Sequence, residues 1–208
     1  MAKRTVVESS LTAVADAIRE RAGITEELTF PEGFSSAVKG IPDLLELRLM
    51  NVLTEYVNTN LTTYAGSSFA GWSSLKKLHL PNVTEGNGWS FQNCHNLTDV
   101  NFDSMRSFGE WAFHLCFALE KIYLPKLEYL HDSVFSNCLS LKTVILANPT
   151  RLVTLANTNA FSETPIASGE GYIYVPRALV DSYRTATNWS TFASQIRAIE
   201  DYPDITGG

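Results

Sequence analysis

Histidine and cysteine are the side chains in this sequence best suited to acid–base, nucleophilic or metal chemistry near neutral pH. The sequence contains His79, His95, His114 and His131, and it contains Cys94, Cys116 and Cys138. No two histidines have the four-residue spacing of a metal-binding helix, and no two cysteines have the spacing of a zinc site. Phosphate-binding glycine loops and nucleophile elbows are also absent from the sequence. We therefore expect no enzyme, no cofactor and no metal site.

A second group of side chains is better suited to binding than to catalysis. His79, Asn101 and Tyr123 follow one another at intervals of 22 residues, with Val57 before them and Ile145 after them. We expect these five to share the exposed face of a sheet, where the polar and aromatic members could contact a sugar or a peptide. The parallel series Glu55, Lys77, Asp99, Lys121 and Thr143 alternates in charge. This alternation predicts pairing between neighbouring strands.

Two tryptophans, Trp89 and Trp111, have the same spacing and are expected to point outward, one above the other. A flat apolar ring with one polar N–H suits contacts with saccharides or proteins. In the alternative interpretation, both indoles fold over neighbouring turns or against a second copy of the chain, which is the commoner fate of tryptophan. The candidate ligand-binding surface therefore consists of His79, Asn101, Tyr123, Trp89 and Trp111.

An internal repeat must position all of these residues. Apolar residues recur every 22 positions over four consecutive units without an insertion. These columns are Phe69, Phe91, Phe113, Phe135; Leu75, Leu97, Leu119, Leu141; Leu78, Val100, Ile122, Val144; Leu80, Phe102, Leu124, Leu146; Trp72, Cys94, Cys116, Cys138; and Val83, Met105, Leu127, Pro149. A fixed period of this length is typical of a solenoid, in which stacked units share one core.

Within one unit, the alternation in Leu78-His79-Leu80 predicts a short strand. The spacing of Phe113, Cys116 and Leu119 predicts a short helical or 3₁₀ turn that faces the core. The cysteine column is then interpreted as small apolar side chains in a crowded layer. A degenerate opening coil is expected over about residues 40–61, and a four-residue insertion near Pro149 displaces Phe161.

The units resemble BspA-type leucine-rich repeats, whose pattern runs close to I-G-x-x-A-F-x-x-C-x-x-L-x-x-I-x-L-P. The matching positions are Phe108, Gly109, Ala112, Phe113, Cys116, Leu119, Ile122, Leu124 and Pro125. The asparagine ladder common in other leucine-rich repeats is absent from its usual position. The resemblance implies a β-rich α/β solenoid of about five to six 22-residue coils, with helical N- and C-terminal caps.

The two ends differ from the repeats. At the C-terminus, residues 172–176 are expected to form a last strand, followed by a helix over residues 177–186 and a second helix carrying Phe192 and Ile196. At the N-terminus, the stretches LTAVADAIR and FPEGF resemble the openings of tail-associated structural proteins of bacteriophages and prophages. We therefore divide the chain into a helical attachment segment (1–40), the solenoid (41–171) and a strand-plus-helix cap (172–208).

Composition limits the partners. A net charge of −6 argues against nucleic acid, because phosphate binding depends on clustered Lys and Arg. No apolar run approaches the roughly 20 residues that span a bilayer, so membrane insertion is not expected. The N-terminus shows no signal peptide, which predicts synthesis and folding in a bacterial cytoplasm.

We consider two functions. The first is a non-enzymatic virion protein of a phage or prophage, associated with a tail fibre or baseplate. Its N-terminal segment would contact other virion subunits or drive homo-oligomerisation, and its repeats would bind a protein or a cell-surface glycan. The alternative, which the repeat family suggests, is a leucine-rich-repeat adhesin on the bacterial cell surface.

Overall fold

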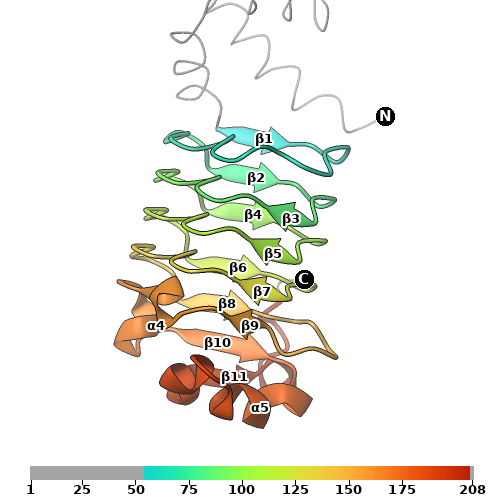
Figure 1. Cartoon of the computed structure of the whole chain (residues 1–208), viewed down its shortest axis with the longest axis vertical. Helices are drawn as coiled ribbons and strands as arrows, with labels where there is room; N and C mark the ends of the chain where they lie inside the picture. The colour runs from blue at the N-terminus through green and yellow to red at the C-terminus, as the bar shows by residue number, and fades with distance from the viewer. Residues whose placement is uncertain (1–53, 207–208) are drawn as a thin grey trace, which may run out of the picture. The chain divides into compact units, whose positions relative to one another are not determined.

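The computed structural model describes residues 54–206. The expected N-terminal segment (1–40) and the first part of the opening coil therefore lie outside the described residues. From Thr54 onward the chain forms a series of stacked coils, each contributing one strand to a parallel ladder (Figure 1). The strands are β1 (Glu55–Val57), β2 (Lys77–His79), β4 (Asp99–Asn101), β6 (Lys121–Tyr123), β8 (Thr143–Ile145), β10 (Tyr172–Val175) and β11 (Ile196–Ala198).

Every pairing in this ladder is parallel, in the orders β1-β2-β4 and β6-β8-β10-β11. The register places Leu78 beside Val100 and Ile122 beside Val144, a shift of 22 residues each time. The repeat period of the sequence is thus the strand-to-strand step of the sheet, which confirms the predicted repeat fold with parallel strands.

The ladder thus comprises two sheets, and a third parallel sheet, which the sequence analysis did not predict, runs beside it (Figure 1). Its four strands have two residues each: β3 (Glu85–Gly86), β5 (Ser107–Phe108), β7 (Tyr129–Leu130) and β9 (Thr154–Leu155). Strands this short carry no alternation that a sequence pattern could reveal. They turn each coil and direct Phe108 and Leu130 inward, where both are fully buried.

The phenylalanine column forms a continuous stack through the core. Successive ring centroids from Phe69 to Phe91, Phe113, Phe135 and Phe161 lie 5.4, 4.9, 5.4 and 5.8 Å apart. Phe69 is 5% exposed, and the other four rings are completely buried. Equivalent side chains in successive coils therefore exclude water together, as the repeat predicts.

The other columns hold with three departures. Trp72 is half-buried, although Cys94, Cys116 and Cys138 in the same column are fully buried. Val100 is only half-buried, although Leu78, Ile122 and Val144 in the same column are buried. Pro149 was expected in the column of Val83, Met105 and Leu127, but it is exposed. Val153 is buried in its place, because the four inserted residues shift the phase of the repeat before the chain re-enters the core.

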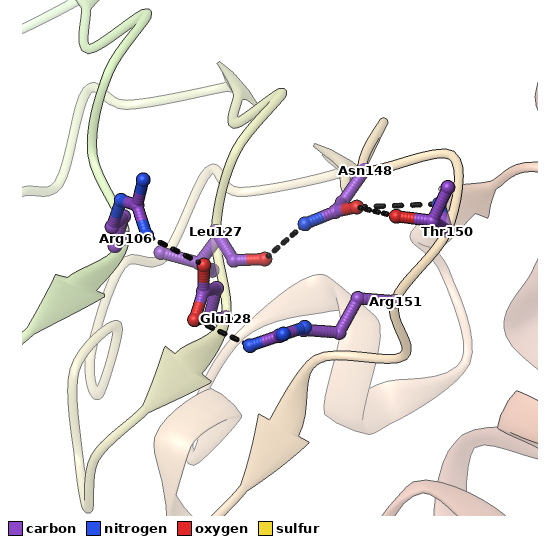
Figure 2. Close-up of polar contacts among 6 residues, drawn as sticks. All are labelled: Arg106, Leu127, Glu128, Asn148, Thr150 and Arg151. Atoms are coloured by element: carbon purple, nitrogen blue, oxygen red, sulfur yellow. Dashed lines mark hydrogen bonds and ion pairs between the residues drawn. The ribbon is translucent and has the colours of Figure 1, made fainter.

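The insertion is attached to the preceding coils by polar contacts (Figure 2). Glu128 accepts hydrogen bonds from Arg106 at 3.2 Å and from Arg151 at 2.8 Å, so that one carboxylate joins three successive coils. The Asn148 amide donates to the Leu127 carbonyl at 3.4 Å, and its oxygen accepts the Thr150 N–H at 3.3 Å. The loop is therefore held in place although its proline points to solvent.

The segment expected to be a short helical turn consists of separate tight turns. Cys116 N–H donates to Phe113 O and Leu119 N–H donates to Cys116 O, each three residues back, at 3.1 and 3.2 Å. Between them Leu115 adopts a left-handed φ of 63°, which no regular right-handed helix contains. The predicted inward direction of the three side chains is right, since all are fully buried.

Asparagine side chains connect the coils, although not at the position of the common asparagine ladder. Asn82 and Asn96 each donate to a backbone carbonyl 23 residues earlier, on Thr59 and Ser73, at 2.6 Å. Both hydrogen bonds are exposed, so these amides link neighbouring coils at their corners in exchange for hydrogen bonds to water.

The C-terminal part combines strands with short helices. Its helices are η1 (Thr158–Phe161), α4 (Pro165–Ser168), η2 (Arg177–Leu179), α5 (Val180–Thr185), η3 (Trp189–Gln195) and η4 (Ile199–Asp201). Phe192 lies on η3 as expected, but Ile196 lies on strand β11 and not on a second helix, because the chain rejoins the parallel ladder there. Trp189 and Phe192 pack on Phe161, 6.0 and 5.3 Å between centroids, so this end of the phenylalanine stack is covered.

Candidate binding surface

The strand face carries His79, Asn101 and Tyr123 on β2, β4 and β6, as predicted, and all three are half-buried. Two of them use their polar atoms within the protein. His79 Nε2 lies 2.8 Å from Asp99 Oδ1, and the Asn101 amide donates to Asp103 at 3.1 Å. A ligand on this face would have to compete with these contacts.

Val57 and Ile145, at the two ends of the strand face, differ in exposure. Val57 is 47% exposed, whereas Ile145 was expected to point outward and is completely buried. In the ladder Ile145 lies between Tyr123 and Tyr174, and the ring of Tyr202 packs edge-on against Tyr174 at 5.1 Å. The C-terminal segment thus returns to this end of the sheet and limits the exposed face.

The charge alternation beside this face produces one close arrangement. Lys77 Nζ and His79 Nε2 lie 3.9 and 2.8 Å from the two carboxylate oxygens of Asp99. Glu55 and Lys121 form no ion pair within residues 54–206. The predicted cross-strand pairing is therefore limited to the β2–β4 pair, and exposed pairs of this kind contribute at most about 1 kcal/mol.

Trp89 and Trp111 form the most prominent outward feature. Their ring centroids lie 5.3 Å apart with an interplanar angle of 7°, so the indoles are stacked. Trp89 is 43% exposed, while Trp111 is half-buried and contacts the edge of His114 at 4.8 Å. The two rings thus stack outside the core, and neither interpretation made from the sequence describes them fully.

The backbone under this pair is unusual. Trp89 and Trp111 have φ values of 61° and 60°, in the left-handed region that bulky residues seldom occupy. The equivalent Ser67 and Ser133 have φ values of 59° and 55°. The coil geometry therefore imposes this conformation at every step, and the indoles project from a fixed, repeated turn.

The predicted residues do not form one site. The strand-face residues lie on β2, β4 and β6, and the two tryptophans lie in the turns that follow β3 and β5. Within residues 54–206, no hydrogen bond, ion pair or ring contact links the two groups. The structure therefore offers two separate candidate surfaces.

A third exposed column was missed by the sequence analysis. His95 stacks on Phe117 with centroids 4.8 Å apart and an interplanar angle of 10°, and Leu139, 56% exposed, follows one coil later. Beyond Leu139 lies an open hollow lined by Glu163, Thr164, Pro165, Ala167, Ser168 and Glu170. The 22-residue spacing of His95, Phe117 and Leu139 was the available signal, but their different chemical types concealed it.

The cysteines form a hydrogen-bonded column in the core. The thiols of Cys94, Cys116 and Cys138 donate to the carbonyls of Phe69, Phe91 and Phe113 at 3.1, 3.2 and 3.0 Å. Burial raises the pKa of the Cys94 thiol to about 12 and that of Cys116 well above its usual value. Since the thiolate is the reactive form, these thiols are suited to packing and not to nucleophilic attack.

The described residues contain neither a metal-binding cluster nor a membrane-spanning helix. Between residues 54 and 206, no three histidine, cysteine or acidic side chains gather closely enough to hold a metal ion. In the same part of the chain, no helix has the length and apolar character needed to cross a membrane.

Comparison with known proteins decides the family. The model for the "BspA type Leucine rich repeat region" matches residues 51–167 in six copies. The chain belongs to the BspA-type leucine-rich-repeat family. One solved structure, the T. pallidum leucine-rich-repeat protein, is similar with 25% identity and a TM-score of 0.45. The match covers 60% of this chain and 52% of that one, so the chain spans about half the length of that protein. No curated protein matches the chain.

Membership of the BspA-type family explains which columns are internal. Phe113, Cys116 and Leu119 match its pattern, and all three are completely buried. Trp111 lies at a position that the pattern leaves open, directly before the matched Ala112-Phe113. The BspA-type positions thus build the coil, and the pattern does not specify the residue at the position of Trp111.

Proposed function

We propose that this BspA-type chain is a non-enzymatic binding module, and that the stacked Trp89 and Trp111 form its main contact surface. The observation that carries the proposal is a stacked indole pair outside the core, in which Trp89 is 43% exposed and Trp111 is half-buried. Large aromatic side chains also contribute most of the binding energy at many interfaces.

The partner that we propose is a protein or a cell-surface glycan. Both are recognised by flat aromatic rings beside polar groups, and both agree with a net charge of −6 better than a polyanion does. The strand face with His79, Asn101 and Tyr123 is proposed as an accessory surface, because its polar atoms already have partners in Asp99 and Asp103.

The biological setting has two candidates. BspA-type repeats favour the bacterial cell surface, where the module would act as an adhesin. The N-terminal stretch that resembles phage tail-associated proteins favours a virion, with residues 1–40 contacting other subunits or a second copy of the chain. Immunodetection of the chain on intact producing cells, compared with purified phage particles, would separate the two settings.

The binding role is tested with the full chain and a double variant, Trp89→Ala/Trp111→Ala. Binding to intact bacteria and to immobilised extracellular proteins is measured, with Leu139→Ala as a matched control that removes another exposed apolar side chain. We expect the double variant to lose at least tenfold in affinity while its far-ultraviolet circular dichroism is unchanged. Retained binding would remove the tryptophan pair from the proposal.

A further inference from the structure

The tryptophan stack occupies part of a regular column. Ser67, Trp89, Trp111 and Ser133 have the same left-handed backbone, and each of the first three donates its N–H to the next coil. The acceptors are Gly88 O at 3.3 Å, Glu110 O at 2.9 Å and Asp132 O at 3.2 Å. The four side chains therefore leave the backbone in similar directions, each displaced by one coil.

The two ends of the stack differ. On the side of Trp111, the next residue in the column is Ser133, which is only 4% exposed, with its hydroxyl 3.1 Å from Asp132 Oδ1. His114 closes the edge of Trp111. On the side of Trp89, the next residue is Ser67, which is exposed and has only a hydroxymethyl side chain. The column is thus buried at the position beyond Trp111, and it is exposed and has no ring at the position beyond Trp89.

Extending the 5.3 Å step from Trp111 to Trp89 by one more coil reaches the space beside Ser67. Ala70 is the residue equivalent to Gln92 and His114 in the earlier coil. The residue next to this space is therefore also small. We propose that this space is a third stacking position, in which a pyranose ring of a glycan lies against the free face of Trp89. The proposal rests on the proposed function and names the ligand class of the same surface.

The polar surroundings favour a sugar over an aromatic side chain of a protein. A pyranose presents an apolar C–H face the size of an aromatic ring, surrounded by hydroxyl groups that need hydrogen-bond partners. Ser67 offers a hydroxyl, and Gln92 offers an amide. Gln92 follows Trp89 by three residues, just as His114 follows Trp111. Within residues 54–206 neither side chain has a hydrogen bond to another group.

The repeat itself supplies a decisive substitution. The backbone at Ser67 already has the φ of Trp89 and Trp111, so Ser67→Trp should fold and place an indole in the third position. This variant blocks the site without removing either native tryptophan. Ser182→Trp, on the exposed surface of α5, is the matched control for an added indole. Trp89→Ala removes the platform itself.

The test uses the full chain with chitotetraose, cellotetraose and mannotetraose as probes, measured by saturation-transfer NMR and tryptophan fluorescence at millimolar sugar. We expect at least one tetrasaccharide to bind the native chain and the Ser182→Trp variant equally. Binding to Ser67→Trp and to Trp89→Ala should be at least tenfold weaker.

The other outcomes separate this inference from the proposed function. If Trp89→Ala abolishes binding but Ser67→Trp does not, the tryptophan surface stands and the third position is wrong. A different result would be that no tetrasaccharide binds, but that a Gly-Tyr-Gly peptide binds the native chain and not the Ser67→Trp variant. The stacking position beside Ser67 would then be supported, and its assignment to a saccharide would be overturned. If sugars bind all variants equally, both the position and the tryptophan surface are rejected.

Discussion

The inward and outward columns of the same coils follow different rules. Inside, the residue at each position must be apolar, and the phenylalanine rings stack at 4.9–5.8 Å over five coils. Outside, a column can change from serine to tryptophan while the backbone stays left-handed, as at Ser67, Trp89 and Trp111. The coil therefore separates folding from recognition by the direction in which a side chain points.

The leucines provide the largest test of this comparison. Leu119 is completely buried and Leu139 is 56% exposed, so the same substitution can be made on both sides of the coil. Leu119→Ala should lower the free energy of unfolding by about 2–5 kcal/mol, because neighbouring coils restrict collapse around the cavity. Leu139→Ala should change it by less than about 0.5 kcal/mol. Urea denaturation measures both, and equal effects would contradict the assignment of inward and outward columns.

The same distinction explains how much the sequence could predict. The columns of Phe113 and Leu119 were predictable, because packing in successive coils requires similar side chains at a fixed period. The two-residue strands beside Phe108 were not, because two residues define no period. The burial of Pro149 was predicted wrongly, because a four-residue insertion shifts the 22-residue repeat at this point. Only the buried position of Val153 in the structure shows where the repeat resumes.

The candidate surfaces were predicted less completely than the core. The outward direction of Trp89 follows from the period, but the contact of His79 with Asp99 depends on side-chain rotamers, which the period does not determine. Ile145 is buried beside Tyr174, on which Tyr202 from the C-terminal segment packs, and a local sequence pattern does not contain this long-range contact. The contacts of outward side chains can thus be known only from the structure, whereas the inward positions can be predicted from the spacing of the sequence.

Alkaline pH provides a second test, in which Cys94→Ala isolates the contribution of an inward side chain. Cys94 has its pKa raised from 9.0 to about 12 by burial, and Tyr183 from 10.0 to about 12. Above pH 9 the unfolded chain releases these protons while the folded chain retains them, so stability falls as pH rises toward 12. At pH 10 the Cys94 thiol should cost about 1.4 kcal/mol of stability. Thermal denaturation between pH 8 and 11 measures this loss, and Cys94→Ala should reduce its slope.

A control for this experiment is the reactivity of the thiols. Iodoacetamide at pH 8.5 should modify Cys94, Cys116 and Cys138 only after urea unfolds the chain, because all three thiols are completely buried in the folded protein. Rapid alkylation of the native protein would show that the cysteine column is accessible, against the complete burial described above.

The smallest effect is expected from the outward ion pairs. Glu128 accepts from Arg106 and Arg151 on adjacent coils, but its side chain is 31% exposed and the arginines are about twice as exposed (Figure 2). Exposed pairs contribute roughly 0.2–1 kcal/mol each, and salt screens them. Glu128→Gln should therefore lower the free energy of unfolding by about 1 kcal/mol or less at low salt, and by less at high salt.

Glu120→Gln is the matched control for this last prediction, because Glu120 is exposed and its side chain forms no ion pair within residues 54–206. Both variants remove one negative charge, so a difference between them isolates the two ion pairs from the change in net charge. Urea denaturation at low and high salt makes the comparison. Glu128→Gln could instead lower the free energy of unfolding as much as Leu119→Ala, and independently of salt. The insertion loop would then contribute as much to stability as a core residue. The separation of folding from recognition would then fail at this loop.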